Sequence, residues 1–188
     1  MQLSPIQRPE YKYFSFLGTW HVEAKRVLRD VAARPELWGE NEWRKGLEAH
    51  TEMRDIWIRY GDVPDDVMRP HFAHWYPAYA KLPSLRPLIF NLMRMAEATH
   101  LGGVLITRIP PGGKINAHVD RGWHPEFYNC KLYLVLKSNP QCVFRVGDER
   151  VTMKEGELWR INNLVEHDVV NDGDTERMTL IMCMKQEH

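Results

Sequence analysis

The sequence predicts a mainly β protein with α-helices in its N-terminal half and a core of short antiparallel strands. Two observations carry this prediction. From residue 103 onward, eight short apolar runs are separated by turns rich in Gly, Pro, Asn and Asp. Before residue 102, two longer segments carry apolar side chains at helical spacing. Eight short strands fit a jelly roll or a small barrel, and the helices are expected to cover one outer face.

Residues 1–102 are predicted to be helical with one core strand, near residues 54–60. The first helix covers residues 17–33, where Val27 and Val31 lie on one stripe. The second covers residues 82–100, and the Gly102-Gly103 pair that follows is expected to end it.

Charged residues are frequent between positions 29 and 48. They predict the solvated face of a helix. Trp38 and Trp43 in the same segment are expected to anchor that helix to the β core.

The C-terminal half, residues 103–185, is predicted to form the β core. Turns are expected at PPGG, SNPQ, GDE, KEGE and NDGD. The sequence shows no repeat and no linker, so one domain over residues 1–188 is expected. The predicted strands are residues 104–109, 114–119, 130–137, 142–146, 150–153, 157–161, 167–170 and 178–185.

Composition narrows the classes of partner. The 188 residues include 25 Lys or Arg and 25 Asp or Glu, so the net charge is zero. Neutrality argues against nucleic acid or a membrane surface as a partner. The start of the chain lacks the pattern of a secretory signal, and no apolar run approaches the length needed to cross a bilayer. The three cysteines are an odd number without CxxC spacing, and a cytoplasmic location is expected.

His118 and Asp120 are the first candidates for chemistry. Alternate residues of a strand project from the same face, so an imidazole and a carboxylate can reach one point. His167, at the start of a later strand, can supply a third ligand. Two histidines and one carboxylate form the facial arrangement typical of non-haem Fe(II) oxygenases, whereas zinc is more often held tetrahedrally.

Arg177 follows His167 by ten residues, across an Asn-Asp-Gly turn. A three-residue turn would pair Arg177 with His167 and place its guanidinium on the ligand face, ready to bind a carboxylate. A two-residue turn would instead pair Arg177 with Asp168 and leave it an ordinary surface arginine. An arginine beside the apolar run that follows favours the functional alternative.

These segments resemble the aspartyl/asparaginyl β-hydroxylase family of Fe(II)- and 2-oxoglutarate-dependent oxygenases. The resemblance rests on PPGGKINAHVD, on the EG turn, on the EHDVVND segment, and on an arginine ten residues after the distal histidine. It covers about residues 103–184 and implies a double-stranded β-helix, a jelly-roll or cupin-like variant that agrees with the strand count.

The resemblance also implies roles for individual residues. His118 and His167 would bind iron, and Arg177 would bind the distal carboxylate of 2-oxoglutarate with help from the hydroxyl of Thr107. Asn129 and Lys131 occupy the positions of two basic residues that the family uses near the proximal carboxylate. Lys131 alternates with leucines along its strand, so it can lie on a polar inward face or on a solvated edge.

The sequence departs from the family in two places. Animal members have glycine where this chain has Asp120, so here the carboxylate ligand is present and the facial triad is complete. The segment RGWHPEFYNC, residues 121–130, has no clear counterpart. Its Trp123 and His124 can border a substrate mouth, or they can simply pack.

The resemblance implies a dioxygenase that uses Fe(II), 2-oxoglutarate and O2 to hydroxylate an unactivated C–H bond in an amino acid or a peptide side chain, releasing succinate and CO2. The expected partner is therefore a peptide or a small molecule. The alternative is a cupin-type metal isomerase or binding module without oxygenase activity. Arg177 separates the two, because a cupin needs no anchor for a dicarboxylate at that position.

Overall fold

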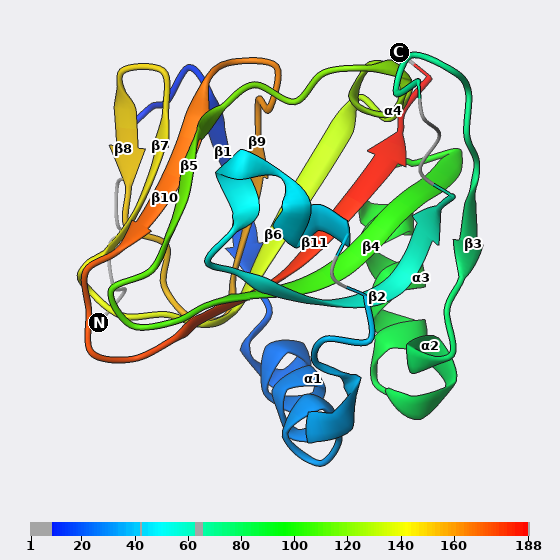
Figure 1. Ribbon diagram of the computed structural model, residues 1–188, viewed down its shortest axis with the longest axis horizontal. Helices are drawn as coiled ribbons and strands as arrows, with labels where there is room; N and C mark the ends of the chain where they lie inside the picture. The colour runs from blue at the N-terminus through cyan, green and yellow to red at the C-terminus, as the bar shows by residue number, and fades with distance from the viewer. Residues whose placement is uncertain (1–8, 42, 63–65, 188) are drawn as a thin grey trace, which may run out of the picture.

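The computed structural model describes residues 9–41, 43–62 and 66–187. Two antiparallel sheets face each other, and helices cover the outer face of the larger one (Figure 1). The predicted double-stranded β-helix is thereby confirmed as the fold class. No helix in the described ranges is long and apolar enough to span a membrane.

The large sheet has seven strands, in the order β1–β9–β6–β11–β4–β2–β3. Their bounds, in that order, are Phe14–Thr19, Glu157–Ile161, Cys130–Lys137, Arg177–Lys185, His100–Ile109, Arg54–Gly61 and Ala73–Trp75. The small sheet has four strands, in the order β5–β10–β7–β8. These are Lys114–His118, His167–Asn171, Cys142–Val146 and Glu149–Val151. All eight strands predicted after residue 103 are present.

The helices are α1 (His21–Ala32), α2 (Ala78–Lys81), α3 (Leu85–Met95) and α4 (Trp123–Phe127). Three short 3-10 helices, η1 (Pro35–Leu37), η2 (Trp43–Gly46) and η3 (Glu48–His50), precede β2. Helices α1 and α3 pack on one face of the large sheet, as the sequence predicted. The cyan segment that contains η2 and η3 lies on the opposite face, the one that faces the cavity described below (Figure 1).

Alternation along β6 and β11 sorts side chains between two layers. On β6, Leu132 and Leu134 belong to the apolar cluster under the helices, whereas Tyr133 and Val135 belong to the cluster between the sheets. Because successive residues of a strand face opposite ways, Lys131 lies on the inner face with Tyr133. The inward alternative for Lys131 is therefore the correct one.

The N-terminal half differs from its prediction, because its described residues form three strands before β4, where one was predicted. β1 lies where the sequence predicted the start of a helix at residue 17, and it pairs with β9 from Phe14↔Ile161 to Thr19↔Glu157. The gain from pairing with β9 outweighs the helical pattern of this short stretch.

The Gly102-Gly103 pair does not end a helix. Helix α3 already ends at Met95, and both glycines lie inside β4. An added Cβ would lie 2.8 Å from the ring of Tyr128 at Gly102, and 3.1 Å from the ring of Tyr60 at Gly103. These glycines therefore let two aromatic rings pack directly against the strand backbone.

The predicted hairpin between the strands of His167 and Arg177 is also wrong. β10 pairs with β5 and β7 in the small sheet, whereas β11 pairs with β4 and β6 in the large one. Asn171 anchors the segment that passes from the small sheet to the large one. Its side-chain amide donates to the carbonyls of Pro110 and Thr175, each at 2.9 Å. The two residues reach one interior from facing sheets rather than from paired strands.

Candidate active site

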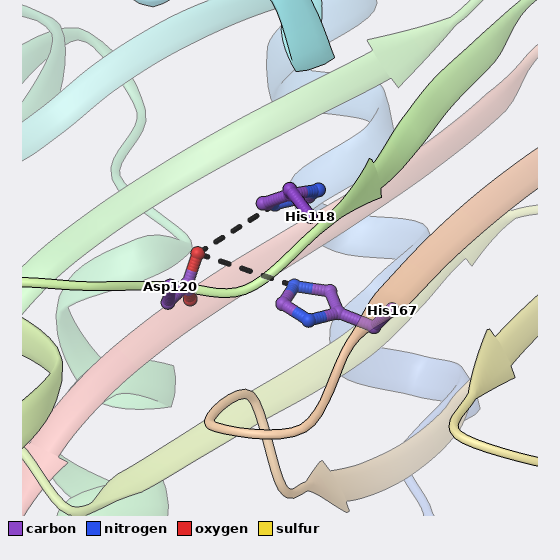
Figure 2. A group of neighbouring side chains, drawn as sticks. All are labelled: His118, Asp120 and His167. Carbon is purple, nitrogen blue, oxygen red and sulfur yellow. Dashed lines mark ion pairs between the residues drawn. The ribbon is translucent and has the colours of Figure 1, made fainter.

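His118, Asp120 and His167 form one cluster at the rim of the space between the sheets (Figure 2). His118 ends β5 and His167 begins β10, and the two residues are register partners. Asp120 lies two residues beyond His118, in the loop that follows β5. One potential ligand atom from each residue lies within 4.8 Å of the other two.

Backbone carbonyls orient both imidazoles. Nδ1 of His118 lies 2.8 Å from the carbonyl of Asn116, and Nδ1 of His167 lies 2.9 Å from that of Val165. Because a carbonyl only accepts, each Nδ1 carries the hydrogen and each Nε2 keeps its lone pair for a metal. Burial also lowers the pKa of His167 to about 4, so its ring is neutral near pH 7.

The two oxygens of Asp120 have different surroundings. Oδ1 faces Nε2 of His118 at 3.6 Å and Nε2 of His167 at 4.0 Å. Oδ2 accepts hydrogen bonds from Lys131 Nζ at 2.5 Å and Asn163 Nδ2 at 2.8 Å. Burial alone would raise the pKa of Asp120, but the ammonium of Lys131 outweighs it and holds this pKa well below its usual value. The ionised carboxylate thus presents one oxygen to the imidazoles.

This cluster fits an Fe(II) site. Two imidazole nitrogens and one carboxylate oxygen converge, and each candidate ligand is held by a further protein group. Two histidines and one carboxylate with positions left open are typical of non-haem iron.

Arg177 and Thr179 lie deeper between the sheets, on the inner face of β11. They are 3% and 0% exposed, and Arg177 Nη2 and Thr179 Oγ1 have no hydrogen-bond partner among the described residues. The guanidinium lies 5.7 Å from the ring centroid of Phe144, which in turn lies 6.2 Å from that of His167. Arg177 and the cluster therefore share one interior, although they are not strand partners.

Unpartnered buried donors indicate a missing acceptor, because a buried guanidinium without an anion is strongly unfavourable. A carboxylate would satisfy both Arg177 and Thr179. Thr179 was missed by the sequence reasoning, although its spacing of two residues from Arg177 on one strand was the available signal.

Thr107 lies on β4 directly opposite Thr179. Its hydroxyl donates to Asp55 Oδ1 at 2.6 Å, so its only proton is already in use. Asp55 also accepts from Arg44 at 2.8 Å, and the pair is buried. The structure therefore places Thr107 opposite Thr179 and engages its hydroxyl with the carboxylate of Asp55.

Asn129 is not brought to the cluster. Its side-chain amide donates to the carbonyl of Gln186 at 3.1 Å, and its oxygen accepts from the Gln186 N–H at 2.9 Å. Lys131 does reach the cluster, but the structure places its ammonium against Asp120.

A cavity of about 360 Å³ opens beside the three candidate metal ligands, which are called the metal cluster below. Its lining includes His50, Tyr60, His124 and Lys131. Nε2 of His124 is buried without a hydrogen-bond partner among the described residues, and burial lowers the pKa of His124 to about 4. Trp123 does not line this cavity; it stacks on Phe127 with centroids 4.6 Å apart. Of the two residues predicted to border a substrate mouth, only His124 therefore lines this cavity.

The segment from Trp43 to His50 forms a cavity wall that the sequence reasoning missed. Arg44 was expected in a solvated face, yet its ion pair with Asp55 is buried. His50 is 7% exposed, its ring packs edge-on against His118 at 4.8 Å, and its Nδ1 has no partner among the described residues. Trp43 is exposed rather than an anchor, whereas Trp38 packs against the helical core as predicted. The sequence feature that could have indicated this wall is Asp55, because a carboxylate in a largely apolar strand needs a cationic partner such as Arg44.

Comparisons with known proteins agree with this geometry. The family model described as aspartyl/asparaginyl beta-hydroxylase matches residues 39–187. A comparison with curated protein sequences finds no match.

Solved structures share the fold. A 2OG-Fe(II) oxygenase family oxidoreductase from Burkholderia pseudomallei is 16% identical with a TM-score of 0.63, over 93% of this chain and 84% of that one. A prolyl-4-hydroxylase from Pseudomonas putida is 16% identical with a TM-score of 0.58, over 94% and 95%. A prolyl hydroxylase from Trichoplax adhaerens, in complex with a hypoxia inducible factor peptide fragment, is 10% identical with a TM-score of 0.65, over 91% and 82%.

The family match spans most of the chain and includes all three members of the metal cluster and Arg177. The chain belongs to the aspartyl/asparaginyl beta-hydroxylase family, and is thus a hydroxylase with Fe(II) as cofactor and 2-oxoglutarate and O2 as cosubstrates.

Proposed function

We propose that this protein hydroxylates an unactivated C–H bond in an amino acid or peptide side chain and converts 2-oxoglutarate to succinate and CO2. When bound, iron and 2-oxoglutarate would together activate O2, one oxygen atom entering the substrate and the other entering succinate. The observation that carries the proposal is the pair of unpartnered donors, Arg177 and Thr179, in the same interior as the metal cluster.

Separate groups of residues would bind the metal and 2-oxoglutarate. His118, Asp120 and His167 would hold the metal at the rim, as their convergent ligand atoms suggest. Arg177 and Thr179 would hold the distal carboxylate of 2-oxoglutarate at the inner end. The apolar ring of Phe144, between these two positions, would exclude water from the cosubstrate.

The cavity beside the cluster would hold the substrate. His50, Tyr60 and His124 line it, so its polar lining can orient a substrate by hydrogen bonds. A peptide is supported by the exposed apolar residues Leu47 and Val67, which also line it and suit the flanking residues of a longer substrate. The likeness in fold to a prolyl hydroxylase solved with a peptide fragment is consistent with this.

Two measurements test the proposal. Anaerobic titration with Fe(II) and 2-oxoglutarate should produce a metal-to-ligand charge-transfer band, and His118→Ala should lose it. A succinate-release screen with peptides, free amino acids and small metabolites should then identify a substrate. Absence of the band in the wild type, or turnover that persists in His118→Ala, would contradict the proposal. A bound metal with 2-oxoglutarate excluded would favour a cupin-type binding protein instead.

A further inference from the structure

A second cavity, of about 330 Å³, lies next to the cavity beside the metal cluster. Pro125 and Asn163 line both cavities, so the two share one wall. Asn163 donates to Asp120 Oδ2 at 2.8 Å, and its backbone carbonyl accepts from the Asp120 N–H at 3.2 Å. The second cavity is therefore fixed in position relative to a candidate metal ligand.

Three chain segments form the second cavity. They are the start of β1 with the residues before it, the end of α4 with the residues after it, and the end of β9 with the loop that leads to β10. The cavity opens to solvent, because exposed residues from all three segments line it: Lys12, Ser15, Glu126, Asn129, Asn162 and Leu164. A polypeptide that leaves the first cavity over Pro125 and Asn163 would therefore enter the second.

Two cations in the wall of the second cavity have no ion pair in the part of the chain that the structure describes. Arg160 is half-buried, and its Nη2 donates to the carbonyl of Asn129 at 3.3 Å. Lys12 is exposed, and its Nζ lies 4.8 Å from the ring centroid of Tyr13. The carboxylate of Glu149 accepts from the backbone N–H groups of Lys12 and Tyr13, each at 2.7 Å, and not from the Lys12 ammonium.

The two cavities differ in charge. In the first, the two buried cations are already paired, Arg44 with Asp55 and Lys131 with Asp120. In the second, Glu126 is the single carboxylate among the lining residues, so two cations leave an excess of positive charge. A guanidinium binds a carboxylate through charge-assisted hydrogen bonds, which are stronger than neutral ones. The second cavity thus suits a carboxylate of the substrate.

We propose that the second cavity is a subsite for an acidic side chain of a peptide substrate, with Arg160 as the residue that determines this specificity. The inference rests on the proposed function and deepens it. A free amino acid has one side chain to place, whereas a peptide can fill both cavities at once. The C-terminal carboxylate of a peptide offers the same chemistry as an acidic side chain, so the test separates these two sources.

The probe is a set of short peptides with acetylated and amidated ends, a randomised central residue, and one Asp placed at each other position in turn. Matched peptides carry Asn instead of that Asp. Succinate release measures the relative kcat/KM of each pair. At one position the wild type should prefer Asp over Asn about ten-fold, because a charge-assisted hydrogen bond contributes more than a neutral one. Asn peptides with a free C-terminus test the other source of the carboxylate.

Four variants separate the second cavity from other sources of charge. Arg160→Gln keeps a hydrogen-bond donor without the charge, and should reduce the preference for Asp to less than about three-fold. Arg160→Glu should reverse it, so that Lys is preferred over Asp at the same position. Arg121→Gln removes an exposed cation that lines the first cavity, and should leave the preference unchanged. Arg150→Gln, on β8 and outside both cavities, should also leave it unchanged.

The outcomes are distinct. Peptide turnover without a preference for Asp, a preference that Arg160→Gln retains, or a preference for the free C-terminus alone overturns the inference, and the proposed function stands. Absence of turnover with every peptide also overturns the inference. The proposed function is then decided separately, by the charge-transfer band and by turnover of free amino acids and small metabolites. Should thermal unfolding show that Arg160→Gln is not folded, Lys12→Gln takes its place and should lower the preference about three-fold.

Discussion

The two ends of the space between the sheets differ in how their polar groups are satisfied. At the rim, Asp120 has partners for Oδ2, and the imidazoles of His118 and His167 each have a carbonyl partner. At the inner end, Arg177 Nη2 and Thr179 Oγ1 are buried and have no partner among the described residues. Polar groups at the rim are thus satisfied by other protein groups, whereas those at the inner end would be satisfied by a bound ligand.

This difference has a consequence for stability. A group whose partners are all present contributes to folding without a ligand, so its removal should destabilise the ligand-free protein. A buried donor without a partner opposes folding, so its removal should stabilise the ligand-free protein and weaken only ligand binding. Mutations at the two ends should therefore have effects of opposite sign.

The largest expected effect is at the metal ligands. His167→Ala removes an oriented nitrogen and should weaken Mn(II) binding by about 1,000-fold or more, equivalent to about 4 kcal/mol. Calorimetric titration measures this directly. His74→Ala, at an exposed histidine of β3, is the matched control and should leave binding unchanged. Comparable metal affinity in His167→Ala would remove this residue from the metal site.

Asp120→Ala tests the organised end without a ligand. It leaves the ammonium of Lys131 buried without its counter-ion, and should lower the free energy of unfolding by about 3 kcal/mol, the lower end of the range for broken buried pairs. The lower end applies because the Asp120 side chain is 21% exposed. Urea unfolding measures this value. The double variant Asp120→Ala/Lys131→Met should recover most of the loss, and failure to recover it would mean that the pairing does not matter for folding.

Arg177→Met should show the opposite sign. Removal of a buried cation without a partner should raise the free energy of unfolding of the ligand-free protein by about 1 kcal/mol. The same change should weaken 2-oxoglutarate binding about 100-fold, or about 2.7 kcal/mol, while Mn(II) binding without cosubstrate does not weaken. Arg150→Met, at an exposed arginine of β8, is the control. A destabilised Arg177→Met protein with unchanged 2-oxoglutarate affinity would mean that Arg177 has only a structural role.

The strands after residue 103 were predictable from the sequence because short apolar runs between turn residues report local preference. The strand β1 was not, because Phe14–Thr19 becomes a strand only through its pairing with β9. The sheet assignment of β10 and β11 likewise depends on which distant strands accept them, and the Asn-Asp-Gly segment does not encode that choice.

The convergence of His118, Asp120 and His167 could be predicted because the first two are close in sequence and His167 belongs to a recognisable segment. The wall from Trp43 to His50 could not, because its role depends on contacts between distant segments. Arg44 becomes an interior residue only through Asp55, eleven residues further on, and His50 only through its packing on His118. A charged segment of this kind is predicted to be solvent-exposed from its sequence. Its contacts with distant residues bury it instead.

The smallest expected effect distinguishes two threonines that face each other across β4 and β11. Thr179→Val removes a hydroxyl without a partner and should weaken 2-oxoglutarate binding about ten-fold, or about 1.4 kcal/mol, without destabilising the ligand-free protein. Thr107→Val removes the donor to Asp55 and should lower the free energy of unfolding by about 1–2 kcal/mol, with less than about a three-fold change in 2-oxoglutarate affinity. Calorimetry and urea unfolding on both variants give the four values. The reverse pattern, with the affinity loss in Thr107→Val, would mean that Thr107 exchanges Asp55 for the incoming carboxylate, as the sequence resemblance implied.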